Sequence, residues 1–265
     1  MAKAKAKLKA KDKPKAKKKG KAKAKPKAKS KSKAASKVKA KAKTKAKAKA
    51  KSKSAAPAKQ KVKPKLIYFD APVSRGEECR LALHLAGIDF DDVRIVRDQW
   101  AAMKPTTPYG SLPVLEIPGQ PPLAQTNAIL VLVGRRHGLH PTDDFEAARH
   151  EAMMCHVEDM RAHVSPALRI SDEAEKIKAR TALAENYLPA WAAYAEKQIA
   201  DKGPFFGGKK LQVVDLKLHR AVHWIAGGII DHIPATVFAG YPKLNRVYAA
   251  VNEHKGVKAW YAKSK

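Results

Sequence analysis

The stretch LIYFDAPVSRGEECRLALHLAGIDFDDVRIV, residues 66–96, contains two short apolar runs with a helical pattern between them. Residues 66–69 and 92–96 predict strands, and residues 76–86 predict a helix that Gly87 ends. A strand, helix, strand order implies a parallel pair of strands joined by a right-handed crossover. The stretch therefore predicts an α/β domain that begins near residue 65.

The residues after this unit predict a small mixed sheet. A polar loop that contains Trp100 and Lys104 comes first. Residues 112–117 then predict a third strand, and residues 122–124 predict a fourth strand after the turn at Pro118-Gly119. The first domain is therefore expected to hold four short strands.

Helical patterns dominate the rest of the chain. Thr126 or Asn127 can cap a helix that ends near Gly138. From residue 143 there is almost no strand signal, and helices are predicted at about 143–168, 172–201, 212–230 and 243–251. We expect an α/β domain over residues 65–140 and an all-α domain over residues 141–265.

The charge of the chain is concentrated before the first strand. Residues 1–65 hold 30 lysines and one acid, Asp12, so they carry +29 of the formal net charge of +31. Lysine alternates there with small residues, and no aromatic residue precedes Tyr68. Such a segment cannot bury enough apolar surface to offset its ordering entropy. Residues 1–64 are therefore predicted to form a disordered basic tail.

A tail of this composition suits polyanionic partners. Dense lysines neutralise phosphates by releasing counterions, and without aromatic residues they do not stack on bases. We expect residues 1–64 to bind nucleic acid or another polyanion; an anionic membrane or a purely solubilising role are the alternatives. The composition resembles the Lys/Ala/Pro-rich tails of linker-histone-like proteins.

No signal peptide and no membrane span are predicted, because the longest apolar runs are too short to cross a bilayer. The two cysteines, Cys79 and Cys155, lie in helical patterns and predict a reducing compartment. A cytoplasmic location is expected, with nucleoid or chromatin association through the tail. The histidine pairs complete no metal-binding motif, so no metal site is predicted.

Six short motifs carry a family resemblance. They are LIYF at 66–69, RGEECR at 75–80, QWAAMK at 99–104, PYGSLPVLEI at 108–117, LAQTNAIL at 123–130, and ED at 158–159. In this order and spacing, residues 66–262 resemble a cytosolic glutathione transferase, closest to the tyrosine-type, sigma-like class. The resemblance implies a thioredoxin-like α/β domain followed by an all-α domain. It also implies conjugation of small electrophiles to glutathione, the co-substrate.

The resemblance gives Tyr68 the role of activating the glutathione thiol. A thiol is mostly protonated at neutral pH, and a hydrogen bond donated to its anion lowers its pKa. Arg75 would add positive charge near the sulfur. The loop between these two residues is one residue longer than in the sigma-like class, and Ser74 is the rival activator. Without the resemblance, the favoured interpretation is a core aromatic residue at a strand end for Tyr68 and a solvated helix-start residue for Arg75; the motifs reverse this preference.

The resemblance also implies the other glutathione contacts. They are Trp100, Lys104, Gly110, Ser111, Leu112, Pro113 with a cis peptide bond, Gln125, Thr126 and Asp159. Asp159 would reach the glutathione of a partner subunit, and Tyr109 would insert into that subunit, so a homodimer is expected. From the residues alone, Gln125-Thr126 is also consistent with plain helix capping.

The second domain departs from the family pattern at Gln212, where Ser or Thr usually stands three residues before Asp215 in a capping box. Met153, Met154 and Met160 suit either an electrophile pocket or a packed core, and helical spacing favours the core. Two other functions stay open: a non-catalytic binding or scaffold module, and a glutathione-dependent isomerase or peroxidase.

Overall fold

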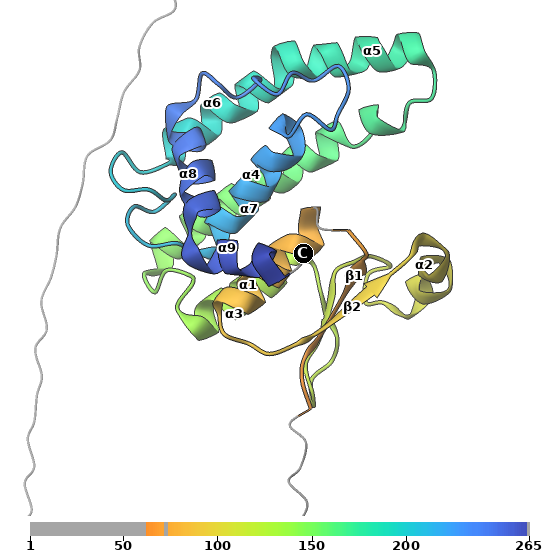
Figure 1. Ribbon diagram of the computed structural model, residues 1–265, viewed down its shortest axis with the longest axis vertical. Helices are drawn as coiled ribbons and strands as arrows, with labels where there is room; N and C mark the ends of the chain where they lie inside the picture. Colours follow the sequence, from red (N-terminus) through yellow and green to blue (C-terminus); the bar gives the residue numbers. More distant parts are fainter. Residues whose placement is uncertain (1–61, 72–73, 264–265) are drawn as a thin grey trace, which may run out of the picture. The chain divides into compact units, whose positions relative to one another are not determined.

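A four-stranded mixed sheet begins the part of the chain that the computed structural model describes, residues 62–71 and 74–263 (Figure 1). The strands are β1 (Lys65–Phe69), β2 (Asp91–Ile95), β3 (Val114–Glu116) and β4 (Leu123–Ala124), in the order β2-β1-β3-β4. Strand β1 is parallel to β2, as predicted, and β3 is antiparallel to both β1 and β4. The predicted disordered tail covers residues 1–64. Only its residues 62–64 are among the described residues, so the prediction of disorder concerns residues that the structure does not describe.

Successive side chains of β1 point to opposite faces of the sheet, and each face packs against its own layer of helix. Leu66 belongs to the core that includes α1 (Ser74–Leu85) and α3 (Thr126–His137). Ile67 points to the other face and packs with Ile95 and Val114 against Trp100 of α2. Figure 1 shows α2 (Arg97–Met103) on the opposite side of the sheet from α1 and α3. The fold is the α/β domain that the sequence pattern predicted, with the thioredoxin-like arrangement that the family resemblance implied.

The predicted polar loop around Trp100 is wrong in part, because residues 97–103 form helix α2 and residues 104–106 a 3₁₀ turn. The apolar pattern that would predict a helix in this segment is short. Trp100 and Met103 lie one turn apart and both pack on the sheet, whereas the remaining side chains of the helix face water. Tertiary contact with the sheet therefore supports a helix that its own sequence only weakly favours.

The regular elements of the second domain, within its described residues, are helices, and irregular segments connect them at 199–212 and 227–241. The helices are α4 (Asp144–Val164), a 3₁₀ turn (Ala167–Arg169), α5 (Glu173–Ala182), a π-helical segment (Leu183–Tyr187), α6 (Leu188–Gln198), α7 (Val213–Ala226), α8 (Pro242–Glu253) and α9 (Lys255–Lys263). The single helix predicted over 172–201 is interrupted by the π segment just before Pro189, which has no N–H to donate. None of the described helices is long and apolar enough to cross a membrane.

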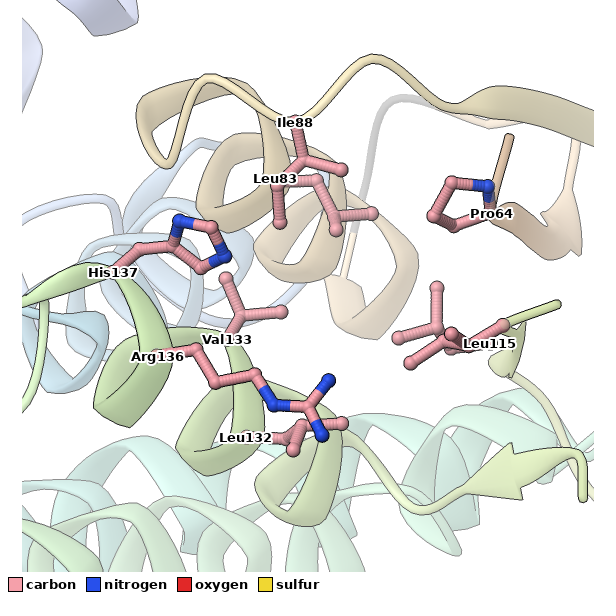
Figure 2. Close-up of a pocket in the computed structure, with 9 residues that line it drawn as sticks. Pro64, Leu83, Ile88, Leu115, Leu132, Val133, Arg136 and His137 are labelled. Atoms are coloured by element: carbon pink, nitrogen blue, oxygen red, sulfur yellow. The ribbon is translucent and has the colours of Figure 1, made fainter. Parts of the chain in front are cut away.

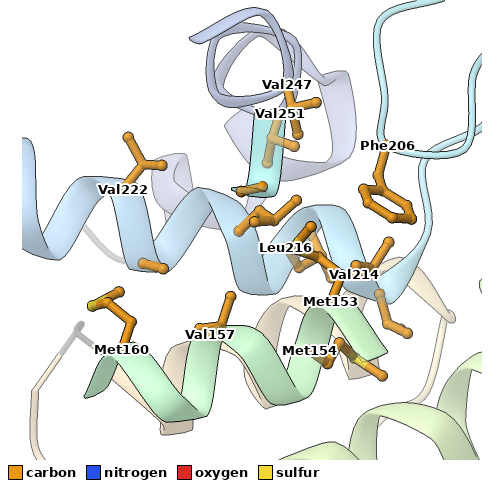
Figure 3. Close-up of a cluster of buried hydrophobic side chains, with 14 of the residues drawn as sticks. Met153, Met154, Val157, Met160, Phe206, Val214, Leu216, Val222, Val247 and Val251 are labelled. Atoms are coloured by element: carbon orange, nitrogen blue, oxygen red, sulfur yellow. The ribbon is translucent and has the colours of Figure 1, made fainter. Parts of the chain in front are cut away.

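Helix α7 lies at the centre of the second domain. Figure 3 shows Met153 and Met160 of α4 pointing at α7, with Val247 of α8 on its other side. The methionines of α4 are at most 3% exposed and pack in the main hydrophobic core. The prediction that they are core residues is confirmed. Both cysteines are free, Cys79 buried and Cys155 exposed.

A buried carboxylate begins α7. The side chain of Asp215 accepts hydrogen bonds from the backbone N–H of Gln212 and of Phe206, each at 2.7 Å. The cap is therefore made from the Asp215 side although Gln212 replaces the usual Ser or Thr. The pKa of Asp215 is raised to about 7, because burial, which raises it, outweighs the backbone hydrogen bonds, which lower it.

We expect Asp215→Ala to lower the free energy of unfolding by about 2 to 4 kcal/mol, because it leaves two buried N–H groups without acceptors. The raised pKa means that the folded chain holds a proton there which the unfolded chain releases between about pH 4 and pH 7. The contribution of Asp215 is therefore larger near pH 5 than near pH 8. Urea unfolding at both pH values measures it.

The matched control is Asp172→Ala, which removes an exposed N-cap aspartate that accepts the Glu175 N–H at 2.8 Å. This variant should lose clearly less stability, because its backbone N–H partner is exposed and water can replace the lost acceptor. Equal losses for the two variants would contradict the role given to the buried cap.

Candidate functional site

Tyr68 lies at the carboxyl end of β1, beside a cleft of about 420 Å³. The other residues lining this cleft are Phe69, Asp70, Ala71, Ile95, Val96 and Arg97. The cleft opens where the parallel strands β1 and β2 end, which is where α/β sheets commonly bind ligands. Tyr68 itself is 9% exposed, so its ring is packed and its position is defined.

Gly76 fixes where the Tyr68 ring lies. A Cβ atom placed on Gly76 would stand 2.1 Å from Cδ1 of Tyr68, closer than real Cβ atoms approach. The ring therefore rests directly on the backbone of the first turn of α1. A glycine is required there because of this close approach.

Arg80 holds the backbone that follows Tyr68. Its fully buried guanidinium donates to the carbonyl oxygens of Phe69 at 3.2 Å and Ala71 at 2.9 Å, and to the Asp92 carboxylate at 2.9 Å. The guanidinium carbon also lies 5.9 Å from the centroid of the Tyr68 ring. The first residues of the loop after β1 are thus tied to α1 and β2 by charge-assisted hydrogen bonds.

The structure brings Tyr68, Ser74 and Arg75 together. Burial raises the pKa of Tyr68, whereas a side-chain hydrogen bond with Ser74 and the positive charge of Arg75 lower it. The pKa stays above the ordinary tyrosine value, so the phenol is protonated at neutral pH and can donate a hydrogen bond. Ser74 has a positive φ of 58°, an uncommon conformation outside glycine.

Five charged side chains form a network beside Tyr68. Glu158 of α4 accepts from Arg75 at 2.6 Å, from Lys217 at 2.5 Å and from Arg161 at 3.0 Å. Glu78 of α1 also pairs with Arg161, and with Lys217 at 3.2 Å. Burial alone would raise the pKa of Glu158, but the three cations outweigh it and hold that pKa at about 2.

Sequence reasoning placed Arg75 in the site but missed the other four members of this network. Glu158 and Arg161 are three residues apart, a spacing that predicts a pair on one helix face. Lys217 lies 139 residues after Glu78, and no local pattern connects them. The burial of these charges is a property of the packed helices α1, α4 and α7.

A second group of predicted residues lies on the α2 side of the sheet. Trp100 and Leu112 pack in the same apolar cluster, and the Trp100 ring is 5.9 Å from that of Phe69. The side chain of Lys104 lies along Gly110, which has a positive φ of 55°. The bond between Leu112 and Pro113 is cis, as predicted, and Ser111 precedes it half-buried.

Gln125 and Thr126 form the amino-terminal end of α3. Gln125 is exposed with a φ of 73°, a left-handed conformation that is strained for this residue. Thr126 is 3% exposed, and its Oγ1 has no hydrogen-bond partner among the described residues. An unsatisfied hydroxyl beside the positive end of a helix fits a ligand carboxylate.

Asp159 has different surroundings from its neighbour Glu158. It is exposed, and its charge acts on Tyr187, whose pKa is raised first by burial and then by this carboxylate. In the single chain, Glu158 is the acid of this pair that contacts Arg75. The structure therefore leaves Asp159 on the surface of α4.

Of the predicted glutathione contacts, only Tyr68 lines the cleft beside it, and three further clefts among the described residues contain none of them. Figure 2 shows an apolar cavity of about 200 Å³ lined by Leu83, Leu115 and Val133, with His137 and Arg136 at its edge. This lining offers little that could bind two carboxylates and an amine. Among the described residues, Glu173, Asp231 and His232 could share a metal ion, a cluster that sequence reasoning missed. Lys176 and Arg180 already pair with its acids.

Comparisons with known proteins agree with this geometry. Residues 64–134 match the family model of the glutathione S-transferase N-terminal domain, and residues 158–264 match that of the C-terminal domain. Glutathione S-transferase 1 of Ascaris suum is 32% identical over 202 residues, which cover 75% of this chain and 95% of the relative.

Two solved structures share the fold. Prostaglandin synthase D of Nilaparvata lugens has a TM-score of 0.68 at 28% identity, covering 77% of this chain and 99% of that one. The glutathione S-transferase of Ascaris lumbricoides has a TM-score of 0.63 at 30% identity, covering 76% and 97%. The chain therefore belongs to the glutathione S-transferase family, as an enzyme that uses glutathione as its co-substrate.

Proposed function

We propose that Tyr68 activates glutathione by donating its hydroxyl hydrogen to the sulfur, and that the thiolate is then conjugated to small electrophiles. The observation that carries this proposal is a buried, protonated Tyr68 beside a cleft, with Arg75 close enough to affect its pKa. A donor to the anionic form stabilises that form, so more of the bound thiol is ionised at neutral pH.

In the proposed reaction the thiol proton passes to solvent and the Tyr68 hydroxyl remains bound to the thiolate. The sulfur then attacks an electrophilic carbon of the second substrate, forming the sulfur–carbon bond as a leaving group departs or a double bond opens. Positioning the thiolate beside the electrophile supplies the remaining acceleration.

The rest of glutathione is proposed to lie across the end of the sheet at which β3 begins. Trp100 and Lys104 suit the glycine carboxylate, because an indole N–H and an ammonium both donate to it. Leu112 would pair its backbone with that of the cysteinyl residue, and Gln125 and Thr126 would bind the γ-glutamyl carboxylate. The unpartnered Thr126 hydroxyl supports the last assignment. Gly110, Ser111 and the cis Pro113 would shape the same segment.

A sigma-like class is supported by the motifs around Tyr68 and by the likeness to prostaglandin synthase D of Nilaparvata lugens. That likeness also favours a second candidate activity, glutathione-dependent isomerisation, in which the same thiolate would act without being consumed. In a non-catalytic scaffold, by contrast, turnover would not depend on Tyr68.

We further propose a homodimer. Tyr109 is 69% exposed at the tip of a loop in the first domain. A cleft of about 170 Å³ on the α4 and α6 surface has room for an aromatic ring, and Met153 and Tyr194 are among the residues that line it. Insertion of Tyr109 into this cleft of a second copy would be isologous, and Asp159 would then face the partner's glutathione.

For residues 1–64 we propose association with nucleic acid or another polyanion, in the cytoplasm and on the nucleoid or chromatin. The support is the lysine content alone. We place the end of this tail at residue 64 and the boundary between the two folded domains at residue 140.

Tyr68→Phe should lower kcat/KM for a generic aromatic electrophile by roughly a hundredfold and leave glutathione affinity within about threefold, because only the donor to the anion is lost. Ser74→Ala is the matched variant and should change the rate much less. Steady-state kinetics and a glutathione titration of both proteins measure this. Unchanged turnover in Tyr68→Phe with a large loss in Ser74→Ala would reassign activation to Ser74.

Tyr109→Ala should raise the dimer dissociation constant at least tenfold, since it removes an aromatic anchor from the proposed interface. Sedimentation equilibrium measures this. Ile229→Ala is the control, because Ile229 is a comparably exposed apolar residue, at 65%, which lies between α7 and α8 and does not line this cleft. Equal effects of the two substitutions would argue against the proposed cleft.

Deletion of residues 1–60 should abolish salt-sensitive binding to double-stranded DNA and leave glutathione transfer unchanged, because 27 of the 30 lysines before residue 66 are removed. For the full-length protein, the logarithm of affinity should fall steeply with the logarithm of salt concentration. Fluorescence anisotropy across a salt series measures it. Equal DNA affinity of the truncated protein would refute the role of the tail.

A further inference from the structure

The network beside Tyr68 holds more positive than negative charge. Arg75, Arg161 and Lys217 supply three cations, and Glu78 and Glu158 supply two carboxylates. Glu78, Arg161 and Lys217 are at most 1% exposed, so water screens these charges little. With both acids ionised, the network carries one net positive charge.

Lys217 is the residue that gives this network its net positive charge. Without it, two arginines would face two carboxylates and the network would be neutral. Its side chain is 0% exposed on α7, and its Nζ contacts both carboxylates, at 2.5 Å and 3.2 Å. Burying a lysine costs free energy unless it is paired, and replacing buried ion pairs by apolar groups often stabilises a protein. Stability alone therefore gives a weak account of this residue.

The hydrogen bonding shows the same excess of donors. Arg161 bonds to Glu78 and Glu158 through its terminal nitrogens, yet its buried Nε has no partner among the described residues. The acids of the network are each already shared by at least two cations. The excess positive charge is thus unmatched within the network.

This charge lies close to the thiol-activating tyrosine. The charges of Arg75, Glu78 and Arg161 all act on the Tyr68 hydroxyl. Arg80, the remaining cation near the ring, pairs with Asp92 and Glu77, and Asp92 is shared with Arg94, so these four side chains together are neutral. Cys79, on the same turn of α1, is buried, and burial raises the pKa of its thiol, so it adds no charge.

We propose that Lys217, a residue of the second domain, gives the glutathione site its net positive charge, and that this charge stabilises the thiolate bound by Tyr68. The inference rests on the proposed function of Tyr68. Lys217 acts from a distance and by holding Glu158, which in turn holds Arg75 beside the site. It is a positioning residue that need not touch glutathione.

A series of charge variants tests the proposal. The pKa of bound glutathione is measured from thiolate ultraviolet absorbance as pH is varied, and the pH profile of kcat/KM is measured alongside. Lys217→Met makes the network neutral and should raise this pKa by roughly one unit, which lowers kcat/KM about tenfold below the pKa. Glu78→Gln adds net positive charge and should lower the pKa.

Two further variants separate charge from structure. Combining Glu78→Gln with Lys217→Met restores the net charge of +1 and should return the pKa close to the wild-type value, as should Lys217→Arg alone. Arg180→Met removes a buried arginine of the second domain that pairs with Asp231. It controls for general destabilisation and should leave the thiol pKa unchanged.

Opposite shifts in Lys217→Met and Glu78→Gln support the proposal, and shifts in the same direction, or none, overturn it. If Lys217→Met does not fold, Glu78→Gln decides alone, because it must lower the pKa. A wild-type protein that binds glutathione without any thiolate absorbance contradicts the role of Tyr68 and this inference together. A wild-type thiolate that is insensitive to the series contradicts only the inference.

Discussion

The ionic contacts that join α1 to α4 and α7 are the constraint on which the rest of the site depends. Helix α1 rests against Tyr68 through Gly76, and Arg80 of the same helix holds the backbone that follows that tyrosine. The other side of α1 is fixed by Glu78, which is paired with Arg161 and Lys217 of the second domain. The thioredoxin-like domain supplies Tyr68, Arg75 and Glu78, whereas the helical domain supplies the other charges of the network, those of Glu158, Arg161 and Lys217.

Much of the fold could be predicted because its signals are local. The strand, helix, strand unit at the start of the first domain follows from apolar periodicity and from Gly87, and it fixes the parallel pair of strands. Helices α2 and α9 were not predicted, because each depends on contact with another element. Val257 of α9 is buried and Trp260 donates to Glu77 of α1 at 2.7 Å. Such contacts span distances along the chain that no sequence window contains.

For the site, too, local sequence signals could be predicted and long-range contacts could not. The residues proposed to bind glutathione are carried by short motifs, and the structure places Tyr68, Ser74 and Arg75 together. The surroundings that decide their chemistry were not predicted. Whether Lys217 is exposed or buried, and which acids it meets, depends on how three helices pack, and burial is what turns ordinary charges into strong ones.

The burial of α7 also bears on how the molecule opens. Eleven of its fourteen residues are buried, and its amino-terminal cap is tied to the backbone at Phe206. Few of its backbone amides lie within reach of solvent, so their hydrogen exchange requires disruption of the whole folded unit rather than local fraying. Because α7 carries Lys217, the charge beside Tyr68 cannot be lost by a small fluctuation. The site is assembled or dismantled together with the core of the second domain.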